Sequence, residues 1–279
     1  MRKATLIGGN GYVGRHLLAR LLRDGWACWV PQRDDLKLMH RDLGQVFYCA
    51  GLTADYAERP FDTVEAHSSL LNQVLRDTTY TSLVYLSSTR LYDSLGHSTA
   101  TEASPLTLDP NNPRHLYDLS KALGESLCRV ASKGRARVAR LSCVWGGDHG
   151  TEGFLPELMR GVLAACKEQG KHPRLQVKSS PHFKRDYVHI DDVIDALIAL
   201  AEPADFGIYN VAGGRNVSNS ELFKCVFDAS GCRVEATSDR PTPALPRISI
   251  ERMAQDFAWT PVDALQRLGM QFKSDLAHA

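Results

Sequence analysis

The sequence has few of the features that mark a secreted, membrane-bound or nucleic-acid-binding protein. Its seven cysteines are an odd number with no CxxC pair, and several, such as Cys49, lie inside apolar runs. We therefore expect reduced thiols rather than a disulfide framework. The formal net charge is only +1, so no overall field favours nucleic acid or a membrane surface as a partner. No apolar run approaches the length of a membrane-spanning helix.

Two further absences narrow the class of protein. Residues 4–7 already read as a buried strand, so the N-terminus lacks the apolar core and cleavage site of a signal peptide, and we expect a cytoplasmic protein. No group of His, Cys and Asp has the spacing of zinc ligands, so no metal site is predicted. The 279 residues are enough for one large α/β domain with a smaller lobe.

Short apolar runs alternate with amphipathic stretches, which predicts βαβ units around a parallel sheet. The predicted strands are residues 4–7, 27–30, 46–50, 83–87, 137–144 and 208–211. The predicted helices are residues 13–23, 64–76, 116–132, 154–168, 191–201 and 219–230. The last helix opens with a capping box formed by Ser218 and Glu221. The segment between residues 30 and 46 is short for a helix and a strand, so the third βα unit should be truncated.

From about residue 146 the alternation weakens and prolines become more frequent. We therefore predict an α/β fold, with a Rossmann-type doubly wound parallel sheet and a smaller C-terminal α/β substrate-binding lobe. The dinucleotide-binding domain should comprise residues 1–145 and about 186–213. The lobe should comprise about 146–185 and 214–279.

A glycine-rich segment, GGNGYVG, follows the first predicted strand and opens the first helix. One glycine makes the turn, another lets backbone amides approach a pyrophosphate, and a third lets the helix pack on the sheet. The free N–H groups and dipole of the helix N-terminus attract the anion. We expect a dinucleotide to be bound here, and the alternative is a tight turn without ligand. The predicted contacts are Gly8, Gly11, Tyr12, Val13 and Gly14.

The end of the second strand lacks a carboxylate for the adenosine ribose. Such an acid is expected near position 31 or 32, where the chain has Pro31 and Gln32 followed by Arg33. Arg33 could pair with a 2′-phosphate, which favours NADP(H). Asp34 or Asp35 could still turn inward and bind a free 2′-hydroxyl, which leaves NAD(H) open.

Tyr117 and Lys121 lie four residues apart, so on a helix they share one face. An ammonium group beside the phenol stabilises the phenolate and lowers the pKa of the tyrosine. Ser88, at the end of a predicted strand, can hydrogen-bond the substrate oxygen. These three residues predict a catalytic set in which Tyr117 moves the hydroxyl proton while a nicotinamide exchanges hydride. Lys121 can also hold the nicotinamide ribose.

With these motifs the chain resembles the extended short-chain dehydrogenase/reductase family, in its branch of sugar-nucleotide epimerases, dehydratases and reductases. The resemblance covers most of the chain and comprises residues 8–14, 83–92, 117–125, 140–146, 185–192, 209–214 and 259–261. It implies that the family's catalytic Ser/Thr, Tyr and Lys fall on Ser88, Tyr117 and Lys121. Residues 32–36 are also similar to NADP-using GDP-fucose synthases, which supports Arg33. The family often forms homodimers through helices such as 64–76 and 116–132.

Two departures from the family pattern narrow the expected reaction. Dehydratases carry an Asp-Glu pair after the catalytic Thr, where this chain has Thr89 and Arg90. GDP-fucose synthases carry a cysteine for epimerisation at the position of Arg90. We therefore expect simple ketone reduction or alcohol oxidation on a nucleotide-activated sugar, or C4 epimerisation with tightly bound NAD. A dinucleotide-sensing scaffold without catalysis is the non-enzymatic alternative.

Residues 171–185 contain five Lys and Arg residues, two His residues and no acid. We expect an anion site for a diphosphate here, with Arg185 the best candidate and Arg247 the second. A solvated basic loop is the alternative.

Thr89 and Arg90 complete the predicted substrate-binding set beside Ser88. Arg90 could bind a substrate carboxylate or phosphate, or pair with Asp93 or Glu102. His189 is expected to be a buried structural residue that holds Asp191 or the backbone.

Overall fold

The computed structural model describes residues 1–33, 35, 38–39, 41–147, 153–170 and 172–277. Within this part of the chain, six parallel strands form a sheet in the order β10-β6-β4-β3-β1-β2. The strands are β1 (Lys3–Ile7), β2 (Ala27–Trp29), β3 (Gln45–Tyr48), β4 (Ser82–Ser88), β6 (Ala136–Leu141) and β10 (Gly207–Val211). The α/β class and the Rossmann-type parallel sheet are thus confirmed.

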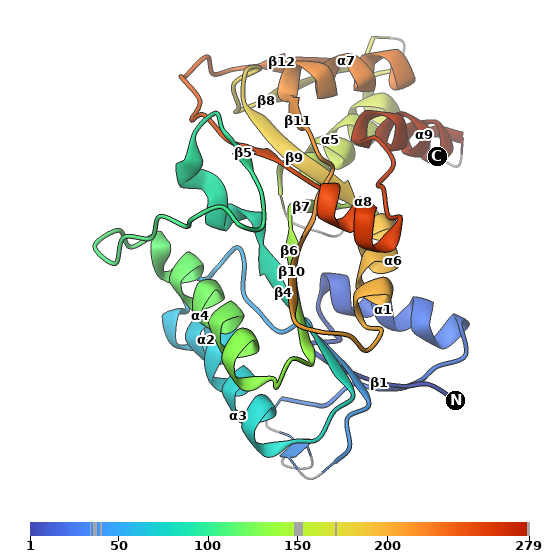
Figure 1. The fold of residues 1–279 in the computed structure, drawn as a ribbon. Helices are drawn as coiled ribbons and strands as arrows, with labels where there is room; N and C mark the ends of the chain where they lie inside the picture. Colours follow the sequence, from blue (N-terminus) through green and yellow to red (C-terminus); the bar gives the residue numbers. More distant parts are fainter. Residues whose placement is uncertain (34, 36–37, 40, 148–152, 171, 278–279) are drawn as a thin grey trace.

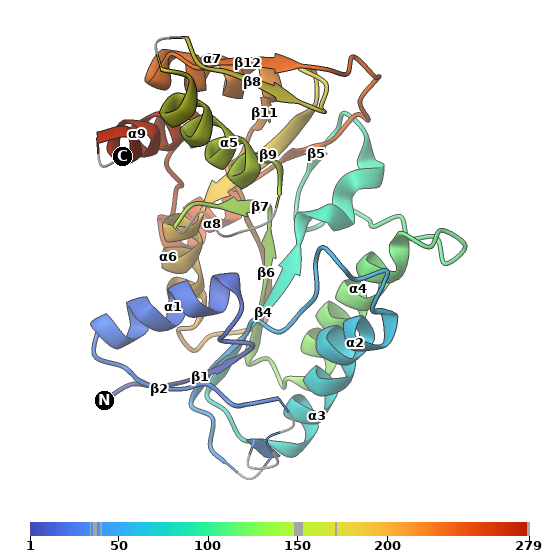
Figure 2. The ribbon, with the colours of Figure 1, turned by 180° about the vertical axis from the view of Figure 1, so that it is seen from behind.

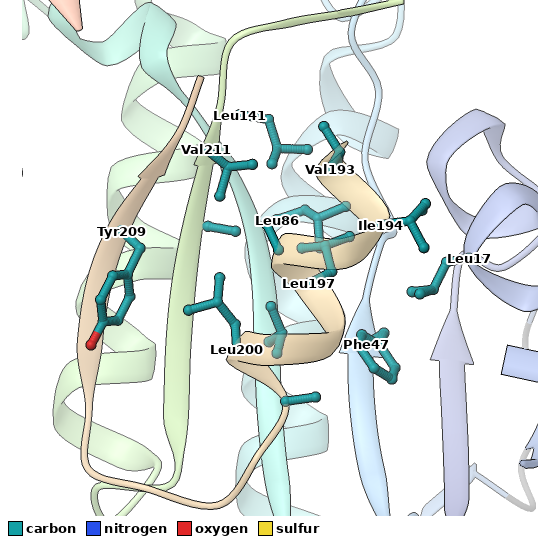
Figure 3. Packing of buried hydrophobic residues seen from close by; sticks show 14 of the residues in the cluster. Leu17, Phe47, Leu86, Leu141, Val193, Ile194, Leu197, Leu200, Tyr209 and Val211 are labelled. Carbon is teal, nitrogen blue, oxygen red and sulfur yellow. The ribbon is translucent and has the colours of Figure 1, made fainter. Parts of the chain in front are cut away.

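Helices cover both faces of the sheet, which explains why its strands are nearly continuous apolar runs. Helices α1 (Tyr12–Arg23) and α6 (Ile190–Leu200) lie on one face, and α3 (Leu70–Asp77) and α4 (His115–Ala131) lie on the other (Figures 1 and 2). On the first face, α6 lies along the sheet and α1 lies beside it (Figure 3). The side chains at this contact include Leu17, Phe47, Leu86, Leu141, Val193, Ile194, Leu197, Leu200 and Val211. Burial of each aliphatic side chain stabilises the folded state by about 2 kcal/mol. This layer therefore holds the helices against the carboxyl ends of the strands.

The strand order reverses beside β1. This strand pairs with β2 on one side and with β3 on the other, so the chain crosses over between β2 and β3. Along the chain, the described residues between Trp29 and Gln45 form no further α-helix or strand of the sheet, in agreement with the predicted truncation of the third βα unit. Ligands of open α/β sheets bind beyond the carboxyl ends of strands at such a reversal.

Two predicted elements are interrupted. The helix expected over 64–76 begins earlier, because Pro60 suits a first turn, and consists of α2 (Pro60–Val64), a π-helical turn η2 (Glu65–Ser69) and α3. The strand expected over 137–144 divides at Ser142 into β6 and β7 (Cys143–Trp145). β7 leaves the large sheet to pair with β9 (Lys184–His189).

The C-terminal half builds a second core of its own. The helices of this core are α5 (Phe154–Gln169), α7 (Asn219–Ser230) and α9 (Ala264–Ala277), whereas α8 (Glu251–Phe257) packs Met253 into the core around α6. The other strands of this half are β8 (Arg174–Val177), β11 (Asn216–Ser218) and β12 (Arg233–Ala236), and β13 (Arg247–Ile248) pairs with β5 (Thr99–Ala100). The capping box predicted for α7 is present.

β9 contributes to both cores, with Val188 under α6 and Tyr187 in the C-terminal core. The predicted domain boundaries, which run close to this strand, remain a prediction. Across the described residues, no helix is both long enough and apolar enough to span a bilayer.

Candidate active site

The glycine-rich turn after β1 has no room for side chains at two positions. Gly8 has a φ of +81°, and a Cβ atom there would lie 2.5 Å from the Ala50 amide nitrogen at the end of β3. A Cβ atom at Gly14 would lie 2.5 Å from the Gly8 carbonyl oxygen and 2.7 Å from the Gly9 Cα. Glycine at position 8 makes the left-handed turn, and glycine at position 14 lets α1 approach it.

Helix α1 begins at Tyr12, and no side chain caps it at Gly11. The N–H groups of its first turn are therefore suited to an anion. The Tyr12 hydroxyl donates a hydrogen bond to the Gly146 carbonyl oxygen over 2.7 Å, which ties the turn to the segment after β7. Val13 packs against the core under α6. The predicted dinucleotide contacts thus lie together at the sheet reversal.

Helix α4 and strand β4 bring the three predicted catalytic residues together. Tyr117 and Lys121 are buried on the face of α4 that packs against β4, and Ser88 is the last residue of β4. The Tyr117 phenol lies near the Ser88 and Thr53 hydroxyls, which both lower its pKa. The Lys121 Nζ lies 6.0 Å from the centre of the Tyr117 ring and donates to the Leu86 carbonyl oxygen over 2.9 Å.

The two titratable members of this set respond to burial in opposite ways. Burial raises the pKa of the Tyr117 phenol, and the nearby Ser88 hydroxyl and the charge of Arg90 lower it. Burial lowers the pKa of Lys121 to about 7, against the opposing effect of Glu125 and Cys49. Lys121 therefore loses its proton close to neutral pH.

Arg90 lies against Tyr117 and is committed to protein partners. Its Nε is 3.2 Å from an Asp118 carboxylate oxygen, and its terminal nitrogen donates to the Tyr56 hydroxyl over 3.0 Å. The prediction that Arg90 pairs with Asp93 or Glu102 is wrong. Asp93 pairs with Arg185, and Glu102 accepts from the Asn210 amide. A substrate contact by Arg90 remains a prediction.

His67 was missed by sequence reasoning, which treated residues 64–76 as one regular helix. The π-helical turn buries its ring against Tyr117, with the ring centres 5.2 Å apart. Its Nε2 accepts from the Leu52 amide over 3.2 Å, so Nδ1 carries the proton toward the Ser120 hydroxyl, 2.8 Å away. Burial lowers the pKa of His67 to about 3, so the ring is neutral. His67 thus joins the loop after β3 to the catalytic helix.

A buried polar network lies beneath the end of β4. The Glu125 carboxylate accepts from Arg140 Nε over 2.8 Å and from the Ser87 hydroxyl over 2.6 Å. Arg140 also donates to the Tyr92 hydroxyl. This ion pair satisfies both charges in a buried setting and fixes the strand and helix that carry Ser88 and Lys121.

Arg33 makes an ion pair with Asp62 of α2, and its side chain is 70% exposed. β2 ends at Trp29, and the first residues after it carry no carboxylate. Asp34, the first of the two acids weighed for a free ribose, lies outside the described residues. The structure places Arg33 on the surface beyond β2, and its contact with a 2′-phosphate remains a prediction.

A small hollow of about 20 Å³ lies between the 3-10 helix η3 (Thr89–Leu95) and the strands β7, β9 and β11. Thr89, Cys143, Arg185 and Asp186 are among the residues that line it. Arg185 reaches the Asp93 carboxylate at 3.4 Å. Thr89 and Arg185, predicted separately as substrate contacts, are therefore brought together.

The rest of the basic run does not gather at this hollow. Arg174 is an exposed residue of β8 that lies 3.6 Å from Glu235, and Lys171 lies outside the described residues. Arg247 is exposed, and its Nε donates to the Gly214 carbonyl oxygen over 2.9 Å. His189 accepts from the Asp191 amide at the start of α6, which confirms the structural role expected for it.

A family model described as the NAD-dependent epimerase/dehydratase family matches residues 4–212. The chain belongs to this family. The match covers the glycine turn, Ser88, Tyr117, Lys121 and Arg185. The family assignment agrees with the resemblance deduced from the motifs.

Similar proteins include a putative UDP-arabinose 4-epimerase of Arabidopsis thaliana, 26% identical over 82% of this chain and 64% of the relative. A dTDP-4-dehydro-6-deoxy-D-allose reductase of Streptomyces bikiniensis is 24% identical over 87% of this chain and 77% of its own length. The chain thus spans less than two thirds of the Arabidopsis relative. Among solved structures, RMD of Pseudomonas aeruginosa complexed with NADPH has a TM-score of 0.74 and 24% identity, and the match covers 99% of this chain and 97% of that one. This likeness shows the fold.

Proposed function

We propose that this member of the family interconverts a ketone and an alcohol on a nucleotide-activated sugar, with an NAD(P) cofactor. The observation that carries the proposal is the convergence of Ser88, Tyr117 and Lys121 beside the glycine turn at the sheet reversal. Arg185 and Thr89 line one small hollow, where Arg185 would bind a substrate anion in place of Asp93. Both curated relatives named above act on sugar nucleotides according to their names.

The residues of the glycine turn fit a dinucleotide. Backbone packs so closely against Gly8 and Gly14 that neither position has room for a Cβ, which brings the turn against the start of α1. The uncapped start of α1 suits a pyrophosphate. When bound, the nicotinamide supplies or accepts the hydride. Lys121 would hold the nicotinamide ribose, since its Nζ lies beside the Gly51 backbone after β3.

Proton transfer falls to Tyr117. In reduction its phenol gives a proton to the substrate oxygen, and in oxidation its phenolate takes the proton back. Ser88 lies near the same phenol, so its hydroxyl can orient the substrate oxygen. In its protonated form, Lys121 stabilises the phenolate. Because Tyr117 is buried, bulk water does not compete for the proton.

NADP(H) is the proposed cofactor. Arg33 supports this choice. Its guanidinium, now paired with Asp62, could bind a 2′-phosphate instead and would keep an anionic partner. NAD(H) remains the alternative, since the matching family is described as NAD-dependent.

C4 epimerisation is the second candidate function, and the similarity to UDP-arabinose 4-epimerases favours it. An epimerase oxidises and re-reduces the same sugar carbon, so it would retain its NAD and need no added cofactor. Release of NAD on denaturation of the purified protein, with turnover in the absence of added NADPH, would identify this case.

We also propose a cytoplasmic homodimer. The described cysteines are all free. Apolar side chains stand exposed on the helices that the family resemblance singles out, with Leu123 and Val130 on α4 and Phe61 on α2. Sedimentation analysis of wild type and of a Leu123→Glu variant tests the dimer, because a charge at this position should shift the protein toward monomer.

The decisive experiment follows NADPH consumption with an NDP-4-keto-6-deoxysugar as substrate. Wild type should oxidise NADPH in the presence of the sugar nucleotide. The rate of Tyr117→Phe should be at least about 100-fold lower, since general acid catalysis accelerates a reaction by about that factor. Tyr80→Phe is the matched control, because Tyr80 is buried in the core on the α3 side of the sheet, away from this site. Full activity in Tyr117→Phe would exclude the assigned proton donor.

A further inference from the structure

Arg90 occupies an unusual position beside the catalytic tyrosine. The carbon at the centre of its guanidinium lies 4.8 Å from the centre of the Tyr117 ring and 4.8 Å from that of Tyr56. The two tyrosine rings themselves lie 5.5 Å apart. The guanidinium therefore contacts both rings of one aromatic pair, at distances typical of cation–π contacts.

The polar contacts of Arg90 fix this placement. Its backbone amide donates to the Ser88 hydroxyl oxygen over 3.1 Å, which ties the start of η3 (Thr89–Leu95) to the catalytic serine. A terminal nitrogen donates to the Tyr56 hydroxyl and to the Arg114 carbonyl oxygen, at 3.0 and 2.9 Å. The Nε faces Asp118, the residue after Tyr117.

These contacts argue against a substrate anion as the partner of Arg90. Its side chain is 24% exposed, and the Asp118 carboxylate already compensates its charge. A substrate carboxylate would compete with Asp118, whose side chain is 7% exposed, and would weaken the ion pair that compensates this buried charge. The guanidinium is therefore turned toward Tyr117 and away from a free anion site.

We propose that Arg90 is a positioning residue for Tyr117, which holds the ring between helix and loop and supplies a permanent positive charge for its phenolate. The role complements Lys121, which loses its charge near neutral pH, whereas a guanidinium keeps its charge throughout the working range. The proposal deepens the proposed function and rests on it for the kinetic part of its test. It explains why an arginine stands where related dehydratases carry an acid.

The surroundings of Tyr117 allow this effect to be isolated. The charged groups near its ring are Lys121, Asp118 and Arg90, because His67 is neutral and burial raises the pKa of Tyr85 well above its ordinary value. The groups that face Tyr117 come from α4 (Asp118, Lys121, with Glu125 one turn on), η2 (His67), the loop before α2 (Thr53, Tyr56), β4 (Tyr85, Ser88) and η3 (Arg90).

The first test needs no substrate. The ultraviolet absorbance of tyrosinate is titrated in the purified protein, and the curve of the matching Tyr117→Phe protein is subtracted to isolate Tyr117. Arg90→Met should raise the midpoint by about one pH unit or more, because an opposite charge this close favours the charged form. Asp118→Asn should lower the midpoint, and Arg90→Lys should stay near wild type.

Folding is controlled by thermal unfolding of each variant. If Arg90→Met does not fold, the double variant Arg90→Met/Asp118→Asn removes the unpaired carboxylate and carries the test. Its midpoint should lie above that of Asp118→Asn alone. Arg76→Met, at an exposed arginine of α3 that pairs with Asp77, is the control and should leave the midpoint unchanged.

The second test separates positioning from substrate binding. In the reduction assay, Arg90→Met should lower kcat and move the basic limb of its pH profile upward, while KM for the sugar nucleotide stays close to wild type. A large rise in KM with an unmoved Tyr117 titration would overturn the proposal in favour of a substrate contact. An unmoved titration alone overturns it even if no substrate is found, so its failure is distinct from that of the proposed function.

Discussion

The protein should become more stable as the pH rises above neutral, because folding buries Lys121 and lowers its pKa. Burial lowers the pKa of Lys121 to about 7, from the ordinary 10.5 that it regains on unfolding. Between these values the unfolded chain holds a proton that the folded protein has released. The unfolding free energy therefore increases with pH through this window. From pH 7 to pH 9 the increase due to this one residue is about 2 kcal/mol.

The variant Lys121→Met tests this linkage directly. It removes the titrating group and leaves the Leu86 carbonyl oxygen without its donor, a fixed cost of about 1–3 kcal/mol that does not depend on pH. Urea unfolding at pH 7 and pH 9 gives the free energies of wild type and variant. The difference between the two proteins should change by about 2 kcal/mol across this range, because other groups titrate equally in both. If the difference in unfolding free energy is the same at pH 7 and pH 9, the pKa of Lys121 is not lowered, and Lys121 does not lose its proton near neutral pH.

Three further substitutions test other parts of the site and fold. Gly14→Ala should weaken binding of NADPH and NADH alike by at least about tenfold, as measured by fluorescence titration, because its Cβ would lie 2.5 Å from the Gly8 carbonyl oxygen and displace the turn. Equal affinity in this variant would show that the turn does not hold the cofactor. Arg33→Ala should raise KM for NADPH and leave KM for NADH nearly unchanged, and a clear wild-type preference for NADH would defeat the argument for NADP(H). Ser218→Ala should lower the unfolding free energy by about 1 kcal/mol through loss of the capping box with Glu221, without effect on kcat.

The parts of the site that sequence could predict are those governed by local geometry. Gly8 and Gly14 stand out because a strand-to-helix turn with bound anion needs positions without side chains. Tyr117 and Lys121 stand out because helical spacing places them on one face. In each case the prediction depends on only a few neighbouring residues, and the structure brings these residues to one end of the sheet.

The remaining contacts depend on segments that are distant in sequence. His67 reaches Tyr117 because one helical turn is π-helical, and no residue pattern indicated that turn. Arg90 pairs with Asp118 across two elements that meet only in the fold, so sequence spacing pointed to Asp93 and Glu102 instead. The pairing of β8 with β12 likewise joins two distant segments, and each alternates polar and apolar residues over only four positions.

The central claim is that Tyr117 and a nicotinamide act on the same carbon–oxygen bond of a bound sugar nucleotide. The most direct measurement uses NADPH with deuterium at the transferable position and an NDP-4-keto-6-deoxysugar, with the product analysed by nuclear magnetic resonance. Wild type should place the deuterium on the carbon that bears the new hydroxyl, and Tyr117→Phe should bind the cofactor normally but form at least about 100-fold less product. Deuterium absent from that carbon, or labelled product formed at the normal rate by Tyr117→Phe, would contradict the account.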